Sequence, residues 1–295
     1  MTFSFFKKRP DTFDYEAERT CKNCGNAFRG RFCNHCGEKV IDAADRSFGR
    51  MAESILNAFT FLEGKFWRSF TAVILHPGKM SAAIREGVQV PYMRLVGIFF
   101  VANFFYFLFP VFNTFNTPLD VQIYYMEYSP WVQQLVGEHT KSNGLDVQVF
   151  TEAYNAHTNN LSKLLLVLLV FIYTIPLSLV NYSKKNFYFD HLQISFEFHA
   201  YLLLINSFLV PLLFKGLISG SAAAFGWNWE FLLTDDVYAP ISRVLFAYFL
   251  IRAQYVYYGN RWWMAIIKGA VLAYLVFYSW HAYRFILFLA TFYTL

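Results

Sequence analysis

The chain has 295 residues, of which 56% are hydrophobic, 21% are aromatic and only 15% are charged. This composition excludes an ordinary soluble domain, in which roughly 25% of the residues are charged. The long apolar runs lack the alternation of half-buried strands, so we expect an all-α polytopic membrane protein. The net charge of +5 becomes informative only through the positions of the charged residues.

The N-terminal tail, residues 1–17, combines a short apolar start with several charges. It lacks the long apolar core and the small-residue cleavage site of a secretory signal peptide. We therefore expect this tail to lie in the cytosol and the first membrane helix to direct insertion.

The stretch "CKNCGNAFRGRFCNHCG" contains every cysteine of the chain: Cys21, Cys24, Cys33 and Cys36. Two C-x2-C pairs, each followed by glycine, are typical of a closed tetrahedral site for structural zinc. The ion would replace the core that so short a segment cannot build. We predict a zinc ribbon over residues 18–42, with four cysteine ligands and no open position for catalysis.

Other interpretations of the cysteine segment are less favoured. Two disulfides would need an oxidising compartment, and a redox C-x-x-C would be expected before a βαβ pattern. His35 lies between two ligands and is expected to be solvated. Nucleic-acid binding is unlikely on this pattern, because the basic residues near the cysteines follow an acidic stretch at 11–18.

Residues 46–91 have apolar side chains at helical spacing, interrupted by Glu63, Lys65 and Arg68. This pattern predicts amphipathic helices in the membrane interface, although residues 50–75 could also span it. His76-Pro77-Gly78 should end the first helix, and a second short helix is expected over about 79–87.

Five apolar segments then reach the roughly 20 residues needed to cross a bilayer: 94–113, 162–182, 192–214, 238–258 and 265–289. Residues 1–94 carry fifteen Lys and Arg, whereas the loop 114–160 carries one lysine and five acidic residues. The positive-inside rule therefore predicts a cytosolic N-terminus and a periplasmic C-terminus, with the remainder, 92–295, as a transmembrane bundle. Two parts of the exterior loop, 129–140 and 145–160, should form short helices, and five tryptophans fall near predicted interfaces: Trp131, Trp227, Trp229, Trp262 and Trp263.

Ionisable residues inside spans are costly and usually face the bundle interior. One group, here called the inner layer, falls near the predicted cytosolic side: His191, Glu197, His199, Arg252 and Lys268. An ion pair of Glu197 with Arg252 or Lys268 would lock helices together; a polar ligand site and a catalytic metal site are the alternatives. Glu197 and His199 are about 200° apart around a helix, which disfavours a shared metal. A second group, toward the outer side, offers candidate contacts to a lipid or an anion: Arg243, His281 and Arg284.

Four stretches together resemble a bacterial family of uncharacterised inner-membrane proteins, a domain of unknown function. They are "GRFCNHCGEK", "ILHPGKMSAAIREGVQVPYMRL", "FDHLQISFEFHAYLLL" and "LIRAQYVYYGNRWWMAIIKG". The resemblance implies a polytopic fold behind a zinc ribbon and no established reaction. It also implies that His191, His199, Arg252, Tyr257 and Gly259 belong to recurring motifs, with histidine often replacing Glu197.

The chain has no P-loop, HExxH or GxSxG motif. The leading functional hypothesis is a non-enzymatic accessory or scaffold subunit of the bacterial inner membrane. Its expected partners are membrane lipids and another membrane protein or a second copy of itself. A membrane enzyme acting on a lipid through the inner layer is the alternative, and a transporter or channel subunit is the third, disfavoured by the lack of an evident repeat.

Overall fold

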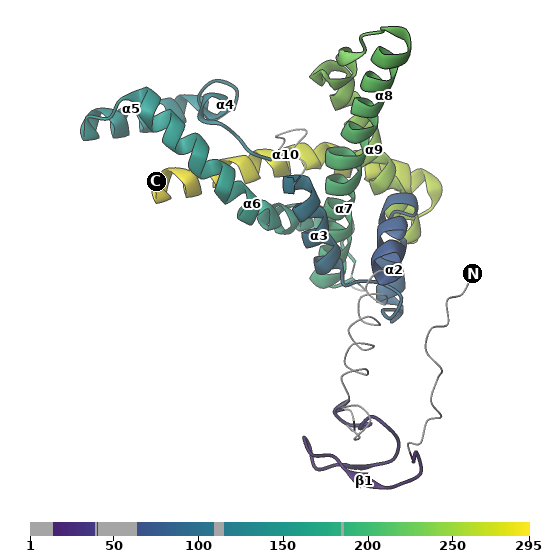
Figure 1. The fold of residues 1–295 in the computed structure, drawn as a ribbon. Coiled ribbons are helices and arrows are strands. Elements are labelled where there is room, and N and C mark those ends of the chain that lie inside the picture. Colours follow the sequence, from purple (N-terminus) through teal and green to yellow (C-terminus); the bar gives the residue numbers. More distant parts are fainter. Residues whose placement is uncertain (1–13, 39, 41–63, 109–114, 184–185) are drawn as a thin grey trace. The chain divides into compact units, whose positions relative to one another are not determined.

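The computed structural model describes residues 14–38, 40, 64–108, 115–183 and 186–295. The chain divides into two compact units, residues 1–63 and 64–295, and each is described by itself (Figure 1). The predicted tail 1–17 and the amphipathic segment 46–91 lie partly outside the described residues. Whether 50–75 spans the membrane or lies in its interface therefore stays a prediction.

The first unit is built around a two-stranded ribbon. β1 (Arg19–Thr20) pairs antiparallel with β2 (Ala27–Phe28), with Arg19 opposite Phe28. Its core is very small: Cys21, Phe28 and Cys33 are buried, and Val40 packs against them. An apolar core of this size contributes too little to fold the segment alone, so the cysteines must supply another source of stability.

The regular elements described in the second unit are all helices. Residues 64–75 form a helix that ends at His76-Pro77-Gly78, as predicted. The elements that follow are α2 (Lys79–Arg85), α3 (Leu95–Leu108), α4 (Leu119–Tyr124), α5 (Ser129–Asn143), α6 (Val147–Val180), α7 (Tyr188–Tyr201), the π-helical η2 (Leu202–Leu209), α8 (Val210–Phe225), the 3-10 helix η3 (Glu230–Leu233), α9 (Asp235–Val256) and α10 (Trp262–Thr294).

Within the part of the chain that the structure describes, three helices are long and apolar enough to cross a membrane: Val147–Val180, Tyr188–Phe225 and Trp262–Thr294. The prediction of five spans is therefore not supported. The described part of the first predicted span, α3, has only 14 residues, about 21 Å of helix against a hydrocarbon core of about 30 Å. The fourth predicted span, α9, is long enough, but Arg243 and Arg252 lower its mean hydropathy.

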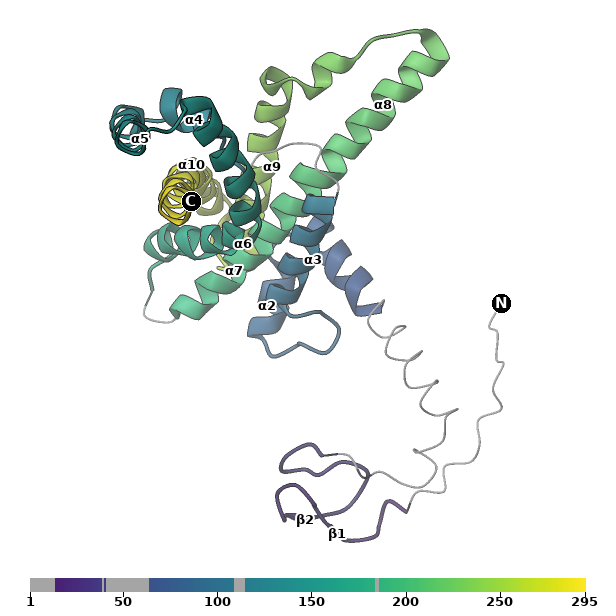
Figure 2. The same cartoon turned by 60° about the vertical axis from the view of Figure 1, so that its left-hand side comes forward.

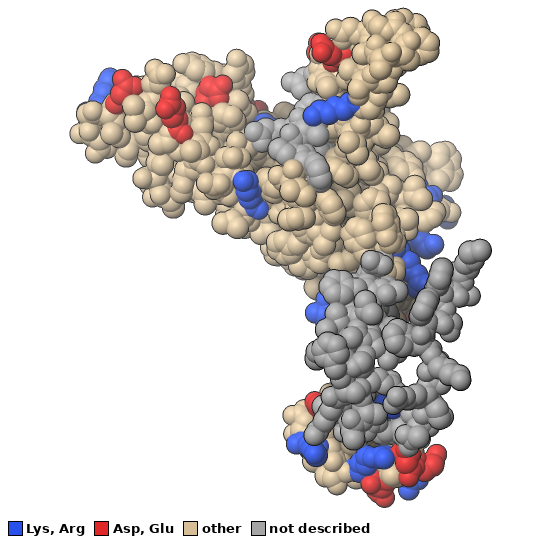
Figure 3. Space-filling view, viewed as in Figure 1, with Lys and Arg blue, Asp and Glu red and all other residues tan. Residues whose placement is uncertain are grey.

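Outward-facing apolar side chains support a membrane environment for the long helices. On α6, Leu164 and Leu179 are each 73% exposed and Ile175 is 55% exposed. Side chains of this size on a soluble surface would form a patch open to water, whereas in lipid they need no cover. Figure 3 shows that most of the visible face of the helical unit carries no charged side chain, and that carboxylates gather over α4 and α5.

The predicted exterior loop 114–160 has more regular structure than the sequence indicated. α5 confirms the helix expected over 129–140, but the second expected helix is the first part of α6, which runs without a break into the membrane segment. Asp146 caps α6 by accepting from the backbone N–H groups of Gln148 and Val149. Aromatic and aliphatic side chains of α4, α5, the start of α6 and the end of α10 form a separate small core: Leu119, Val132, Val136, Phe150, Tyr154, Phe288 and Phe292.

The main core joins α3, α6, α7, α9 and α10 (Figure 2). α10 packs along α6 and α9, and α7 packs between α3 and α6. α9 and α10 approach closely at Gly269, where an added Cβ would lie 2.9 Å from the Ile251 backbone. This packing brings the turns after α6 and after α9 to one end of the unit, which we call the polar end.

Candidate metal centre and the polar end of the helical unit

The four cysteines of the first unit form one cluster. Their sulfur atoms all lie within 4.8 Å of one another, with Cys21 Sγ 3.5 Å from Cys36 Sγ and Cys24 Sγ 3.7 Å from Cys33 Sγ. None of the four is in a disulfide. Four sulfurs bound at about 2.3 Å around a tetrahedral ion would lie about 3.8 Å apart, so the cluster fits such an ion.

The two C-x2-C turns have the same backbone pattern. Gly25 N donates to the Cys21 carbonyl and Gly37 N to the Cys33 carbonyl, each at 2.9 Å. Both glycines have a positive φ, 73° and 77°, which a side chain would disfavour. The sequence thus builds two matching turns, each presenting two thiols on the same side.

Backbone amides act on the two thiols of the second C-x2-C turn. Hydrogen bonds from the backbone amides of Cys36 and His35 lower the pKa of the Cys33 thiol to about 6. The backbone amide of Glu38 lowers the pKa of Cys36 in the same way. A thiolate is the form that binds a metal ion, so these bonds favour the ligating state of this turn. The Cys24 thiol differs: despite a backbone hydrogen bond from Asn26, desolvation and the neighbouring cysteines raise its pKa to about 12. His35 is exposed, as expected.

In the second unit, the Glu197 carboxylate is fully buried in α7 and takes its hydrogen bonds from another helix. It accepts from Gly78 N at 2.9 Å, from Ser81 N at 2.8 Å and from the Ser81 hydroxyl. These donors belong to the first turn of α2, whose N-cap residue is a glycine without a capping side chain. Glu197 therefore caps α2 from a distance and satisfies backbone N–H groups that the helix cannot satisfy itself.

The predicted ion pair of Glu197 with Arg252 or Lys268 is wrong. Between these three described side chains no ion pair forms, because the carboxylate is occupied by Gly78 and Ser81. Lys268 Nζ instead donates to Asn181 Oδ1 at 3.3 Å. Arg252 is partly buried, and its Nε has no hydrogen-bond partner among the described atoms.

The two histidines of the inner layer have separate partners. His191 Nδ1 lies 2.8 Å from the Tyr258 hydroxyl, with the two rings stacked. His199 Nδ1 lies 2.7 Å from the Ser195 carbonyl; because a carbonyl oxygen only accepts, this nitrogen carries the proton. No hydrogen bond or ion pair joins any two of the five inner-layer residues, all of which are described.

The outer group is also dispersed. Arg243 is exposed on α9. His281 Nδ1 lies 2.9 Å from the Phe277 carbonyl one turn earlier, and the Arg284 carbonyl accepts from Gln122 Nε2 at 3.2 Å. The contact of His281 lies within α10, and that of the Arg284 carbonyl joins α10 to α4.

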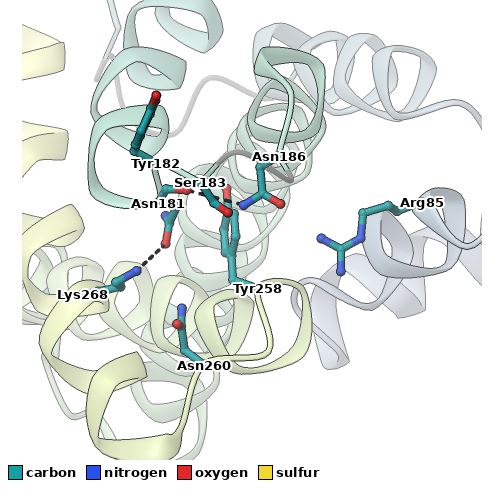
Figure 4. A pocket seen from close by; sticks show the side chains of 8 residues that line it. All are labelled: Arg85, Asn181, Tyr182, Ser183, Asn186, Tyr258, Asn260 and Lys268. Atoms are coloured by element: carbon teal, nitrogen blue, oxygen red, sulfur yellow. Dashed lines mark hydrogen bonds between the residues drawn. The ribbon is translucent and has the colours of Figure 1, made fainter.

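Sequence reasoning missed a cavity of about 450 Å3 at the polar end (Figure 4). It is lined by side chains of α2, of the turns after α6 and α9, and of α10, among them Arg85, Asn181, Asn186, Tyr258, Asn260 and Lys268. Only Lys268 was among the candidate residues. The available signal was the predicted topology, which places both turns and α2 on the same side of the membrane.

Contacts between the turn after α9 and the first turn of α7 hold this end together. The Tyr257 hydroxyl donates to the Asp190 carbonyl at 3.0 Å, beside the contact of His191 with Tyr258. The Arg85 guanidinium lies over the Tyr257 ring, 4.4 Å from its centroid. Three segments predicted to lie on the cytosolic side therefore meet at the polar end.

A scan against models of protein families gives no match, and searches of curated proteins and of solved structures find no significant similarity. The resemblance to an uncharacterised bacterial family therefore stays a prediction.

Proposed function

We propose that this chain is a multi-pass protein of the bacterial inner membrane, acting as a non-enzymatic accessory or scaffold subunit. Its helical unit would bind a lipid or a partner membrane protein. The cysteine unit would be a zinc ribbon in the cytosol that serves folding or docking. The observation that carries this proposal is the dispersal of the inner layer, in which no two side chains share a hydrogen bond or an ion pair.

The same observation argues against the enzyme alternative. A catalytic acid, base or metal site needs its groups within hydrogen-bond reach of a common reacting atom. The Glu197 carboxylate accepts hydrogen bonds from the first turn of α2, and His199 Nδ1 donates to the Ser195 carbonyl. The remaining cations, Arg252 and Lys268, share no described hydrogen bond with these groups, so no acid–base pair forms in the inner layer.

Zinc is the proposed ion for the cysteine cluster. Four thiolates match its preference for sulfur ligands in a closed tetrahedral shell. Such a site would contribute the folding free energy that the small core of the first unit lacks. With four protein ligands it would leave no position for a substrate.

The proposal is tested with purified protein reconstituted in nanodiscs made from a total bacterial lipid extract. We expect lipid mass spectra to stay unchanged over hours, and native mass spectrometry to show lipid or protein bound at a fixed stoichiometry. His199→Ala should leave that stoichiometry unchanged. Time-dependent conversion of a lipid that is lost in His199→Ala would contradict the proposal and favour the enzyme.

A further inference from the structure

The cavity at the polar end has the chemistry of an anion site. Arg85 on α2 and Lys268 on α10 face it from opposite sides (Figure 4). None of the described residues that line it is acidic. Its volume of about 450 Å3 lies within the range of small-molecule sites, about 300–1,000 Å3. A negatively charged group of modest size would meet two cations there.

Both cations keep their charge available. Lys268 Nζ is held by a neutral amide oxygen, Asn181 Oδ1, at 3.3 Å. Arg85 lies over the Tyr257 ring, and neither cation forms an ion pair among the described residues. The acidic residue of the adjoining turn, Asp190, uses its carboxylate to accept from Phe187 N at 2.8 Å. An incoming anion would thus have no protein carboxylate to displace from either cation.

Neutral donors stand between the cations. The amide of Asn186 is oriented by its bond to the Asn181 carbonyl, and that of Asn260 by its bond to Gln254 Oε1. Burial raises the pKa of Tyr258 well above its usual value, so this residue stays a neutral phenol. Guanidinium, ammonium and neutral donors around one cavity form a set suited to phosphate oxygens, which accept several hydrogen bonds at once.

Exposed aromatic side chains flank the same turns. Tyr182 is 83% exposed, Phe187 76% and Trp262 70%. Aromatic residues at the ends of membrane helices are typical of the headgroup level of a bilayer. These side chains support a position of the cavity at the level of the lipid phosphates.

We propose that this cavity binds a phosphate group of net negative charge, held between Arg85 and Lys268. The proposal deepens the proposed function and rests on it, since it names the ligand class of the same helical unit. An anionic lipid headgroup and a soluble phosphomonoester share this chemistry, and the test distinguishes these two sources.

The test is native mass spectrometry of the full-length protein in detergent, titrated with three probes. Phosphatidylglycerol carries a net charge, phosphatidylethanolamine with the same acyl chains does not, and sn-glycerol 3-phosphate represents the soluble source. We expect phosphatidylglycerol to bind several-fold more tightly than phosphatidylethanolamine. Arg85→Gln and Lys268→Gln should each weaken this binding roughly tenfold or more, because each removes a charge-assisted contact.

Lys163→Gln is the matched control. It removes the same charge from an exposed lysine of α6 that does not line the cavity, and it should leave binding unchanged. Binding of glycerol 3-phosphate in place of the lipid, with the same loss in Arg85→Gln and Lys268→Gln, would support the site with a soluble ligand. Equal binding of the two lipids, binding unaffected by both variants, or no binding of any probe would overturn the proposal.

Two further measurements separate a failure of the phosphate site from misfolding of a variant and from a failure of the proposed function. If a cavity variant fails to fold, the reactivity of Lys268 toward an amine reagent is measured in the wild-type protein. Phosphatidylglycerol should protect Lys268 and leave Lys163 reactive; no protection would overturn the proposal. Conversion of the added lipid during the titration would instead refute the non-enzymatic function, whereas loss of the site alone would leave that function standing.

Discussion

The four cysteines of the first unit turn toward one another, whereas the five residues of the inner layer in the second unit form no bond among themselves. The difference follows from the size of the two cores. The first unit buries only a few apolar side chains, so we expect its four thiols to fold around one shared metal ion. The second has an extended apolar core; four of its five inner-layer side chains take separate partners, and Arg252 Nε has none among the described atoms.

Polar residues that lie at a similar predicted depth in the membrane do not by themselves form a site. They form one only when their side chains contact one another or a common ligand. In the cysteine unit the four ligands are each other's neighbours, within 15 residues. In the helical unit the partner of Glu197 lies 116 residues away, and its role is to hold α2 against α7.

The largest expected effect is loss of the shared ion. Cys33→Ser should abolish metal binding and unfold the cysteine unit, because a structural zinc site in a small domain contributes about 10–16 kcal/mol. The helical unit should stay inserted in the membrane. Metal content by mass spectrometry and limited proteolysis measure both effects.

His35→Ala is the matched control for this prediction. His35 lies between two ligands but is exposed, so we expect full metal content in this variant. Metal retained by Cys33→Ser, or lost from His35→Ala, would refute the assignment of four cysteine ligands.

The next largest effect should come from the distant cap. Glu197→Gln replaces one of the two carboxylate oxygens with an NH2 group, which cannot accept a hydrogen bond. Buried donors of α2 are then left unsatisfied, at a cost of about 1–3 kcal/mol. We expect a lower melting temperature in detergent. Glu152→Gln, an exposed carboxylate of α6, should change nothing, and equal melting temperatures for wild type and Glu197→Gln would show that the cap is not stabilising.

A pair of glycine variants separates backbone strain from packing at the same helix. Gly78 and Gly87 have φ values of 81° and 89°, so alanine strains both by about 1–2 kcal/mol. Only at Gly78 would the new Cβ meet another helix, 3.0 Å from Ala253 Cα. Thermal unfolding should show the larger loss for Gly78→Ala; an equal loss would mean that α2 does not pack against α9 there.

The smallest effect is expected for Tyr258→Phe. It removes the hydroxyl that contacts His191 Nδ1 at 2.8 Å while keeping the stacked ring, so the loss should be about 1 kcal/mol. Tyr255→Phe, at an exposed position of α9, should be neutral. If neither variant changed the melting temperature, the contact of the Tyr258 hydroxyl with His191 would not contribute to stability.

Local patterns were predictable and long-range partners were not. The C-x2-C spacing predicts the cluster because ligand geometry is set within a few residues, and Pro77-Gly78 predicts the end of a helix for the same reason. The described part of α3, 14 residues long, and the two arginines of α9 leave the five spans indicated by the apolar runs without support. Ser81 as the partner of Glu197 could not be found, because helical periodicity does not specify which helices meet.

The most direct test of the central contrast is metal content per chain of the detergent-purified protein. We predict one zinc per chain, lost in Cys33→Ser and unchanged in His199→Ala, as expected if the inner layer serves structure and ligand binding only. A second metal ion that survives Cys33→Ser and disappears in His199→Ala would contradict the account, because the inner layer would then converge on a metal.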